Sequence, residues 1–182
     1  MEEVGKLLQM APPQRALLYK VALETGLRAN KLNSLQVGDF SPEKTTIFLN
    51  AENAKDRRAI EIPVSSNLCD LINETVKDKT EEERLFPGLI FPEQSRYIST
   101  DFKAAGISKT TRECKVDFHA LRTTHVNLGL GLGFDAKTVQ SLARHKSIDM
   151  TMNVYAKPHA ERMRSAVEAL GDCISGSVQA EK

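Results

Sequence analysis

The spacing of apolar residues changes along this chain, and this change constrains its fold more than any other feature. Apolar residues recur at helical spacing between Pro12 and Gly26, and again from residue 98 onward. In between, residues 45–49 and 58–63 form two short runs typical of strands, separated by the polar segment 50–57. The pattern predicts a mostly α-helical protein with one small antiparallel β-sheet, which is an α+β fold.

The same spacing, together with glycines that end helices, sets the expected boundaries of the other elements. Helices are expected at residues 29–36, 68–76, 98–106, 119–130, 135–143, 149–156 and 158–170. The proline-containing segment 85–97 is expected to be a surface loop. Because no linker or internal repeat divides the chain, residues 1–174 are predicted to form one domain and residues 175–182 a flexible tail.

The composition excludes several classes of protein. Of the 182 residues, 41% are hydrophobic and 27% are charged, a balance typical of a soluble globular protein and not of a disordered or fibrous one. No run of about 18 apolar residues occurs, so no membrane partner is expected. Cys69, Cys114 and Cys173 are far apart, which favours neither a disulfide framework nor a zinc site. We therefore expect a cytoplasmic protein with reduced thiols.

The net charge of +1 conceals an uneven distribution. Residues 1–100 carry 13 basic and 15 acidic side chains, whereas residues 101–170 carry 11 basic and 7 acidic ones. The chain's 4 histidines also lie in this second segment. Because binding surfaces respond to local charge, the near-neutral total does not exclude a nucleic-acid partner.

Six side chains stand out as candidates for chemistry. They are Arg28, Lys55, His119, Arg122, His145 and Tyr155. His119 and Arg122 lie three residues apart in an expected helix, and therefore on one face of it. Taken singly, each residue has an ordinary structural explanation, such as a solvated cation or a half-buried tyrosine. The order and spacing of the whole set favour a functional role.

In this order, the set resembles the catalytic domain of tyrosine recombinases, the phage integrase and Xer-type recombinase family. The resemblance is carried by T-G-L-R at 25–28, H-A-L-R at 119–122, L-A-R-H at 142–145 and M-N-V-Y-A at 152–156, together with a hairpin lysine. It covers residues 12–170 and implies the fold of an integrase catalytic domain. It also implies site-specific DNA recombination through a 3′-phosphotyrosine intermediate.

By this resemblance, Arg28 and Arg122 are the family's pair of active-site arginines. Elementary chemistry agrees, because phosphoryl transfer builds negative charge on the non-bridging oxygens, which two planar guanidiniums can bind bidentately. The arginines replace a metal in this role, and no carboxylate or His/Cys cluster has metal-ligand spacing. We therefore expect no cofactor, no metal and no need for ATP.

The resemblance assigns the other four residues to bond formation and proton transfer. Tyr155 is the expected nucleophile, and its phenol, with an ordinary pKa of about 10, needs help to lose its proton. His119 is the expected general base, and His145 is expected to hydrogen-bond the phosphate or the leaving oxygen. Lys55 would protonate the 5′ oxygen as it leaves.

The resemblance also implies partners. Double-stranded DNA is the expected substrate, bound by a homo-oligomer that is a tetramer during recombination and a monomer in the absence of DNA. Arg144, Lys146 and Lys157 flank the expected site and are candidate DNA contacts. The last predicted helix is amphipathic and would pack within its own chain or, as in the family, on a neighbouring protomer.

Two residues depart from the family's pattern, and one of them, Lys31, together with a missing domain, leaves an alternative open. Lys31 stands where the family usually has an acidic residue that braces the first arginine, and Arg144 stands where it usually has glycine. Too little chain precedes residue 25 for the family's N-terminal core-binding domain, which is expected to be absent. The alternative is a non-catalytic or weakly active DNA-binding domain of a decayed recombinase. Relaxation of DNA supercoils by the same chemistry, as in type IB topoisomerases, is expected only as a side activity.

Overall fold

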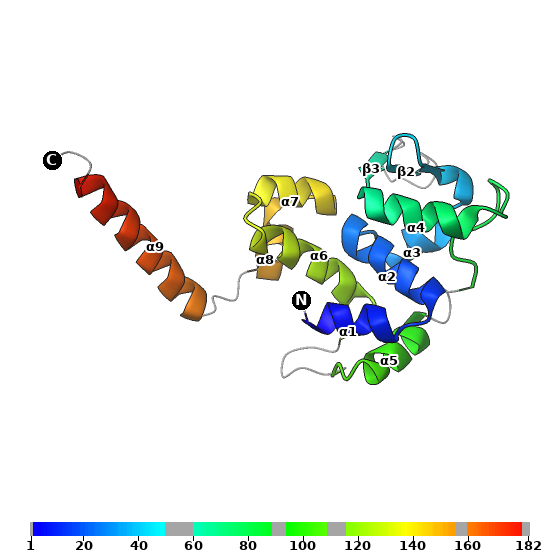
Figure 1. Ribbon diagram of the computed structural model, residues 1–182, viewed down its shortest axis with the longest axis horizontal. Coiled ribbons are helices and arrows are strands. Elements are labelled where there is room, and N and C mark those ends of the chain that lie inside the picture. The colour runs from blue at the N-terminus through cyan, green and yellow to red at the C-terminus, as the bar shows by residue number, and fades with distance from the viewer. Residues whose placement is uncertain (1, 50–59, 89–93, 109–115, 156–159, 180–182) are drawn as a thin grey trace.

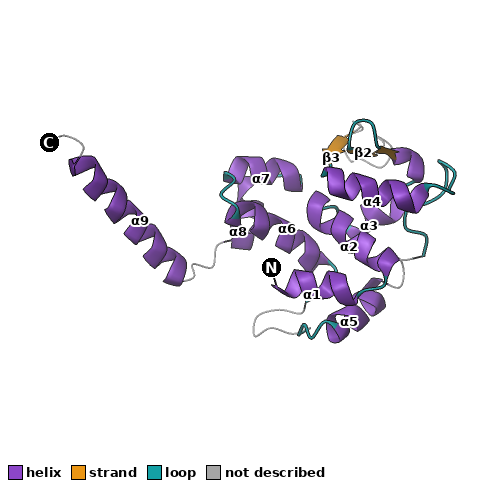
Figure 2. Ribbon diagram, viewed as in Figure 1, coloured by secondary structure: helices purple, strands orange, loops and turns teal. Residues whose placement is uncertain are grey.

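The structure is a computed structural model that describes residues 2–49, 60–88, 94–108, 116–155 and 160–179. Its elements follow one another along the chain as helices, interrupted once by three strands (Figure 1, Figure 2). They are α1 (Glu2–Met10), α2 (Pro13–Thr25), α3 (Ala29–Ser34), the 3₁₀ helix η1 (Val37–Asp39), β1 (Phe40–Ser41), β2 (Thr46–Leu49), β3 (Ile60–Pro63), α4 (Ser66–Val76), α5 (Gln94–Ala104), α6 (His119–Gly131), α7 (Ala136–Ala143), α8 (Ile148–Tyr155) and α9 (Ala160–Gln179).

The β-sheet has three antiparallel strands in the order β1-β2-β3. Ile47 of β2 lies opposite both Phe40 of β1 and Ile62 of β3, and all three side chains are buried. One face of the sheet is therefore covered by the core. The predicted small antiparallel sheet and the mostly helical fold are confirmed. Strand β1 was not predicted, because two residues are too few to show an alternating pattern.

Helix α2 runs through the larger of two hydrophobic cores. Leu18, Val21 and Ala22 are almost completely buried, and α2 contacts α1, α3, α4 and α6. The helix begins at Pro13 and ends before Gly26, which has a φ of 61° and donates its N–H to the carbonyl of Ala22. These are the boundaries that the sequence predicts, because proline suits the first turn of a helix and glycine suits a left-handed C-cap.

Helices α7 and α8 pack on α6 around a second, smaller core. It consists of Val126, Val139 and Ala143, with Leu130 and Val154 packed against it. Helix α6 contributes Leu121 to the larger core and Val126 to the smaller one. It therefore joins the α7–α8 unit to the rest of the molecule.

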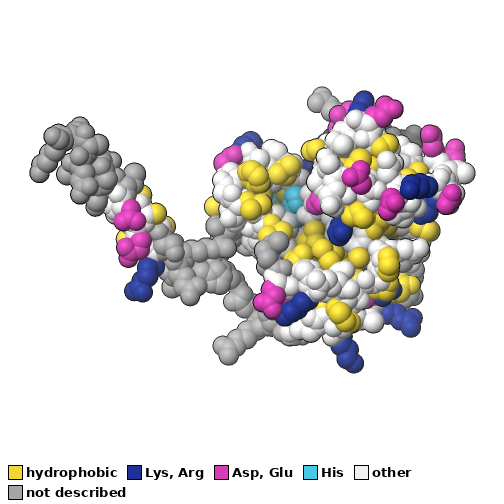
Figure 3. All heavy atoms as spheres, viewed as in Figure 1, with side chains coloured by type: hydrophobic (Ala, Val, Ile, Leu, Met, Phe, Trp, Pro, Cys, Tyr) yellow, Lys and Arg dark blue, Asp and Glu magenta, His cyan; other side chains and the backbone are white. Residues whose placement is uncertain are grey.

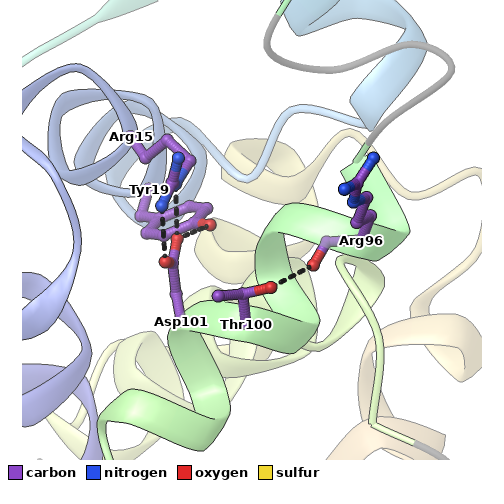
Figure 4. A network of polar contacts seen from close by, with 5 residues as sticks. All are labelled: Arg15, Tyr19, Arg96, Thr100 and Asp101. Atoms are coloured by element: carbon purple, nitrogen blue, oxygen red, sulfur yellow. Dashed lines mark hydrogen bonds and ion pairs between the residues drawn. The ribbon is translucent and has the colours of Figure 1, made fainter.

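A buried polar network fastens α5 to α2 (Figure 4). Asp101 accepts hydrogen bonds from Arg15 Nε and Nη2 at 2.8 and 2.9 Å and from the Tyr19 hydroxyl at 2.6 Å. Burial raises the pKa of Tyr19, and the Asp101 carboxylate raises it further, so the Tyr19 hydroxyl stays protonated. The Tyr19 ring also contacts the Phe118 ring, with centroids 6.3 Å apart, just before α6 begins. The network therefore positions the start of α6.

Several boundaries differ from the predicted ones. Helix α1 was not predicted, although Leu7 is buried and Val4 and Leu8 pack against the core at helical spacing. Helix α5 begins at Gln94, inside the segment predicted as a loop. Helix α9 continues past the predicted end at residue 170 to Gln179, because apolar spacing persists as far as Ile174. The predicted flexible tail thus falls partly within α9, and residues 180–182 lie outside the described residues.

Helix α9 projects away from the other described elements (Figure 1). Met163, Val167, Leu170 and Ile174 recur along it at helical spacing, and each is more than 60% exposed. No described helix is both long and apolar enough to cross a membrane.

Candidate active site

A pocket of about 200 Å³ lies between the start of α3 and the start of α6. It is lined by Leu27, Arg28, Ala29, Asp117, Phe118, His119 and Arg122. Three of the six residues that the sequence singled out therefore share one pocket, although about 90 residues separate Arg28 from His119 along the chain. The contact between α2 and α6 brings the two segments together.

Arg122 is the buried member of the arginine pair, with only 4% of its surface exposed. Its Nη1 donates to the carbonyl of Gly26, and its Nη2 donates to the carbonyl of Ala143. A guanidinium has five N–H donors, so these two bonds leave others for the pocket. Burial, with the nearby Arg28 and Arg144, lowers the pKa of Arg122 to about 10, and the side chain is still cationic at neutral pH.

Arg28 is the exposed member of the pair, and it lies between α2 and α3. Its backbone carbonyl accepts hydrogen bonds from the N–H groups of Lys31 and Leu32, which fixes the first turn of α3. The Lys31 side chain is partly exposed and makes no ion pair among the described residues. Lys31 therefore does not take over the role of the acidic residue that usually braces the first arginine in the family.

His119 begins α6 at the edge of the pocket and is exposed. Its backbone N–H donates to Asp117 Oδ1 at 2.8 Å. This bond satisfies one of the N–H groups that a helix start leaves without a partner. Asp117 thereby fixes the backbone from which the His119 side chain extends.

His145 lies after the C-terminus of α7 and is partly buried. Its Nδ1 is 2.9 Å from Oγ1 of Thr151, whose side chain is completely buried in α8. Burial lowers the pKa of His145, and the charges of Arg122 and Arg28 lower it further. The imidazole is therefore neutral at pH 7, with its orientation fixed by Thr151 and its second nitrogen available for another partner.

Arg144 has a left-handed backbone conformation, with φ 54° and ψ 45°, at the C-cap of α7. This conformation explains why the family usually has glycine here. The Arg144 Nη2 donates to the carbonyl of Thr25. Burial and the neighbouring Arg28 lower the pKa of Arg144 to about 10. The guanidinium, predicted to be a DNA contact, is thus bound to the protein's own backbone.

The other predicted site residues are less completely described. Lys55 and Lys157 lie outside the described residues. Tyr155 is the last residue of α8, and its side chain is outside the described part of the structure. Lys146 is exposed next to His145.

His125 lies against the backbone of the T-G-L-R segment. Its Nδ1 is 2.8 Å from the carbonyl of Leu23, and burial lowers its pKa. A Cβ atom placed on Gly26 would lie 2.7 Å from the His125 ring, so Gly26 is needed for this close approach as well as for its positive φ. Next to His125 is a second hollow of about 200 Å³, which lies between β3 and α7. In Figure 3 a histidine side chain is visible between the α7 side and the α4 side of the molecule.

The arrangement suits the binding of an anion with dispersed negative charge. Arg28 and Arg122 contribute two guanidiniums and His119 an imidazole, while Asp117 is the one carboxylate among the described lining residues. Phosphate and its transition states present several oxygens that guanidiniums bind well. Among the described residues, no group of three or more His, Cys, Asp and Glu side chains is placed to hold a metal ion.

Three supporting residues were missed by the sequence analysis. Asp117 could have been found, because an aspartate just before a helix start is a common capping residue. The Thr25 carbonyl and the Thr151 hydroxyl carry no local signal, because their partners lie on other elements or across a turn.

The comparisons with known proteins agree with this geometry. Residues 1–162 match the model of the phage integrase family. The chain is 27% identical over 183 aligned residues to tyrosine recombinase XerA from Pyrococcus furiosus, and this alignment covers 92% of the chain. The alignment covers 59% of that relative, so the chain spans less than two thirds of its length.

Solved structures share the fold. The crystal structure of XerA recombinase superposes with a TM-score of 0.73 at 20% identity, over 93% of this chain and 62% of that one. XerH site-specific recombinase bound to difH substrate superposes with a TM-score of 0.68 at 22% identity, over 91% of this chain and 52% of that one. Since the family model matches most of the sequence, this chain belongs to the phage integrase family.

Proposed function

We propose that this chain is the catalytic domain of a tyrosine-type site-specific DNA recombinase. It would cleave one DNA strand and rejoin it to another through a 3′-phosphotyrosine. The observation that carries the proposal is the shared pocket of Arg28, His119 and Arg122, with the neutral His145 within electrostatic reach of all three. The names of the relatives, which are tyrosine and site-specific recombinases, support the same activity.

The two arginines would stabilise the transition state. When an oxygen attacks a phosphodiester, negative charge accumulates on the non-bridging oxygens of the pentacoordinate phosphorus. Arg28 and Arg122 remain cationic throughout, and the buried Arg122 is already held by two carbonyls, so it needs no reorganisation during the reaction. Removing either guanidinium is expected to slow cleavage on the order of 10²–10³-fold.

Cleavage would be a balanced transesterification. The Tyr155 oxygen forms a bond to phosphorus while its phenolic proton passes to His119, and the bond from phosphorus to the 5′ oxygen breaks. Lys55 gives a proton to that 5′ oxygen. Rejoining reverses these steps with a 5′ hydroxyl from another strand, so no external energy source is consumed.

His145 would act as a hydrogen-bond donor to the phosphate. In this proposal the Thr151 hydroxyl donates to Nδ1, so the proton of the neutral ring is on Nε2 and can be donated to a phosphate oxygen. The depressed pKa keeps the ring in this neutral form at pH 7.

The partners would be double-stranded DNA and further copies of this chain. Lys146 and Lys157 are proposed as phosphate contacts flanking the site. The projecting α9, with its exposed apolar residues, supports packing against another protomer in an oligomer on DNA, a tetramer during recombination. We place this activity in the cytoplasm.

A decayed, non-catalytic DNA-binding domain is the weaker candidate. Lys31 was the residue that favoured it. A decayed active site would have no need for the buried Arg122 or for the Thr151–His145 contact, both of which cost desolvation of polar groups.

The proposal is tested by trapping the covalent intermediate. Nicked duplexes with a randomised core lose a short strand after cleavage, so a covalent adduct accumulates on a denaturing gel and its DNA can be sequenced. Wild type is expected to form the adduct and Tyr155→Phe to form none. Tyr97→Phe is the matched control, since Tyr97 lies near Arg15 and away from the pocket. An adduct that persists in Tyr155→Phe would overturn the assignment.

The role of Lys55 has its own test. A substrate with sulfur in place of the 5′ bridging oxygen releases a thiolate, which needs no general acid because thiols have a pKa of about 8.5. Lys55→Ala should therefore lose cleavage of the ordinary substrate and regain it with the sulfur-containing one. Equal loss with both substrates would show that Lys55 has another role.

A further inference from the structure

Arg144 has an unfavourable backbone conformation for a residue with a side chain. Among the described residues, Arg144 and Thr45 are the two non-glycine residues with positive φ. A glycine would avoid the steric cost of the left-handed region. An arginine at this position therefore needs a compensating contact, and its guanidinium makes one.

That contact bridges two segments of the active site. The Arg144 Nη2 donates to the carbonyl of Thr25, 119 residues away in the sequence. Beside it, Arg122 donates to the carbonyls of Gly26 and Ala143. Two guanidiniums thus connect the turn that precedes Arg28 with the turn that precedes His145.

The connection matters because the two turns belong to different cores. Helices α7 and α8 pack on α6 around Val126, Val139 and Ala143, whereas α2 and α3 belong to the larger core. Arg144 therefore adds a direct bond between units that are otherwise joined through α6. It holds His145 and α8 in a fixed position relative to Arg28.

We propose that Arg144 is a positioning residue, which holds the α7–α8 unit against the T-G-L-R turn by binding the Thr25 carbonyl, and that it is not a DNA ligand. The inference rests on the proposed function, because the groups that it positions are those of the proposed cleavage reaction. The arginine that stands in place of the family's glycine thus has a structural role within the protein.

Charge alone would not perform this task. The guanidinium is partly buried, and a planar group with several fixed donors can bind a carbonyl there at a defined angle. A lysine ammonium is more strongly hydrated and lacks this geometry, although it serves well against an exposed phosphate. Arg144→Lys therefore separates the two roles, and Arg144→Gly removes the bond while relieving the backbone strain.

The experiment measures DNA affinity and cleavage rate separately. Affinity of the wild type, Arg144→Gly and Arg144→Lys for a nicked duplex is measured across a series of salt concentrations. The rate of covalent adduct formation is then measured with protein in saturating excess, at a temperature well below the Tm of each variant. Lys137→Gln is the control for charge removal, since Lys137 is exposed on α7 and faces Gln140.

Both Arg144 variants are expected to keep the wild-type salt dependence and to form the adduct on the order of ten to a hundred times more slowly, as expected for a lost hydrogen bond to a charged group. A variant that is only less stable would keep the wild-type rate under these conditions. The proposal is overturned if Arg144→Gly lowers the salt slope by about 0.9, the value for one phosphate contact, and Arg144→Lys restores it.

Hydrogen exchange tests the proposal without any activity. Amides of α7 and α8 should exchange about tenfold faster in both Arg144 variants than in wild type, while those of α2 and α4 are unchanged. Unchanged exchange in α7 and α8 overturns the proposal. If wild type forms no adduct, the proposed function fails, and the exchange result alone decides whether Arg144 fastens this unit.

Discussion

Replacing Gly26 by alanine should destabilise the protein strongly, although it adds a single methyl group. Gly26 has a φ of 61°, and the left-handed conformation costs a residue with a side chain about 1–2 kcal/mol. The new Cβ would also lie 2.7 Å from Cδ2 of His125, whose ring is held by the Leu23 carbonyl. Overpacking of this kind costs about 1–3 kcal/mol. Together the two effects predict a loss of about 2–5 kcal/mol.

Urea unfolding, followed by circular dichroism, measures this loss directly. For a chain of this size the corresponding fall in Tm is about 4–20 °C. Gly5→Ala is the matched control, because a Cβ on Gly5 meets no atom within 4 Å and the residue lies inside α1. It should stabilise the protein by about 0.5–1 kcal/mol.

A double-mutant cycle separates the two causes. In the Gly26→Ala, His125→Ala double variant the steric overlap is gone. The sum of the stability losses of the two single variants should therefore exceed the loss of the double variant by about 1–3 kcal/mol. The reasoning is refuted if the free energy of unfolding of Gly26→Ala lies within about 0.5 kcal/mol of the wild-type value, because ordinary surface substitutions change stability by about that much. Zero coupling in the cycle would refute the part that concerns the His125 ring.

Three further predictions concern other parts of the structure. Thr151→Val, which is nearly isosteric, should slow adduct formation about tenfold at unchanged DNA affinity, because His145 loses its hydroxyl partner; an unchanged single-turnover rate would contradict this. The free energy of unfolding should fall as the pH drops from 7 to 5, since His125 and His145 have lowered pKa values when folded and the unfolded chain therefore binds more protons. Urea titrations should show that the free energy of unfolding depends less on pH in His125→Gln than in wild type. Asp101→Asn should cost about 3 kcal/mol in urea unfolding, because it leaves Arg15 without its carboxylate partner; a loss below 1 kcal/mol would count against this network.

Much of the fold could be predicted from local signals. Pro13 and Gly26 delimit α2 as expected, and Asp135 caps α7 by accepting N–H bonds from Lys137 and Thr138. Strand β1 was not predicted because it has only two residues, and helix α1 because it has only nine, although Val4, Leu7 and Leu8 recur in it at helical spacing. These elements are stabilised by tertiary packing, which periodicity along the sequence does not record.

The candidate site divides in the same way. Arg28, His119 and Arg122 could be identified from their order and spacing, and they do line one pocket. The role of Arg144 could not, because its guanidinium binds a carbonyl 119 residues away. A basic side chain next to an active-site motif looks like a phosphate contact until the fold shows which acceptor lies within its reach.

The most direct test of the central claim is the chemical identity of the covalent adduct. Tryptic digestion of the trapped complex, followed by mass spectrometry, should locate a 3′-phosphonucleotide on Tyr155, and the released strand should carry a free 5′ hydroxyl. A nucleotide on any other residue, or a linkage to the 5′ end, would contradict cleavage by Tyr155 through a 3′-phosphotyrosine.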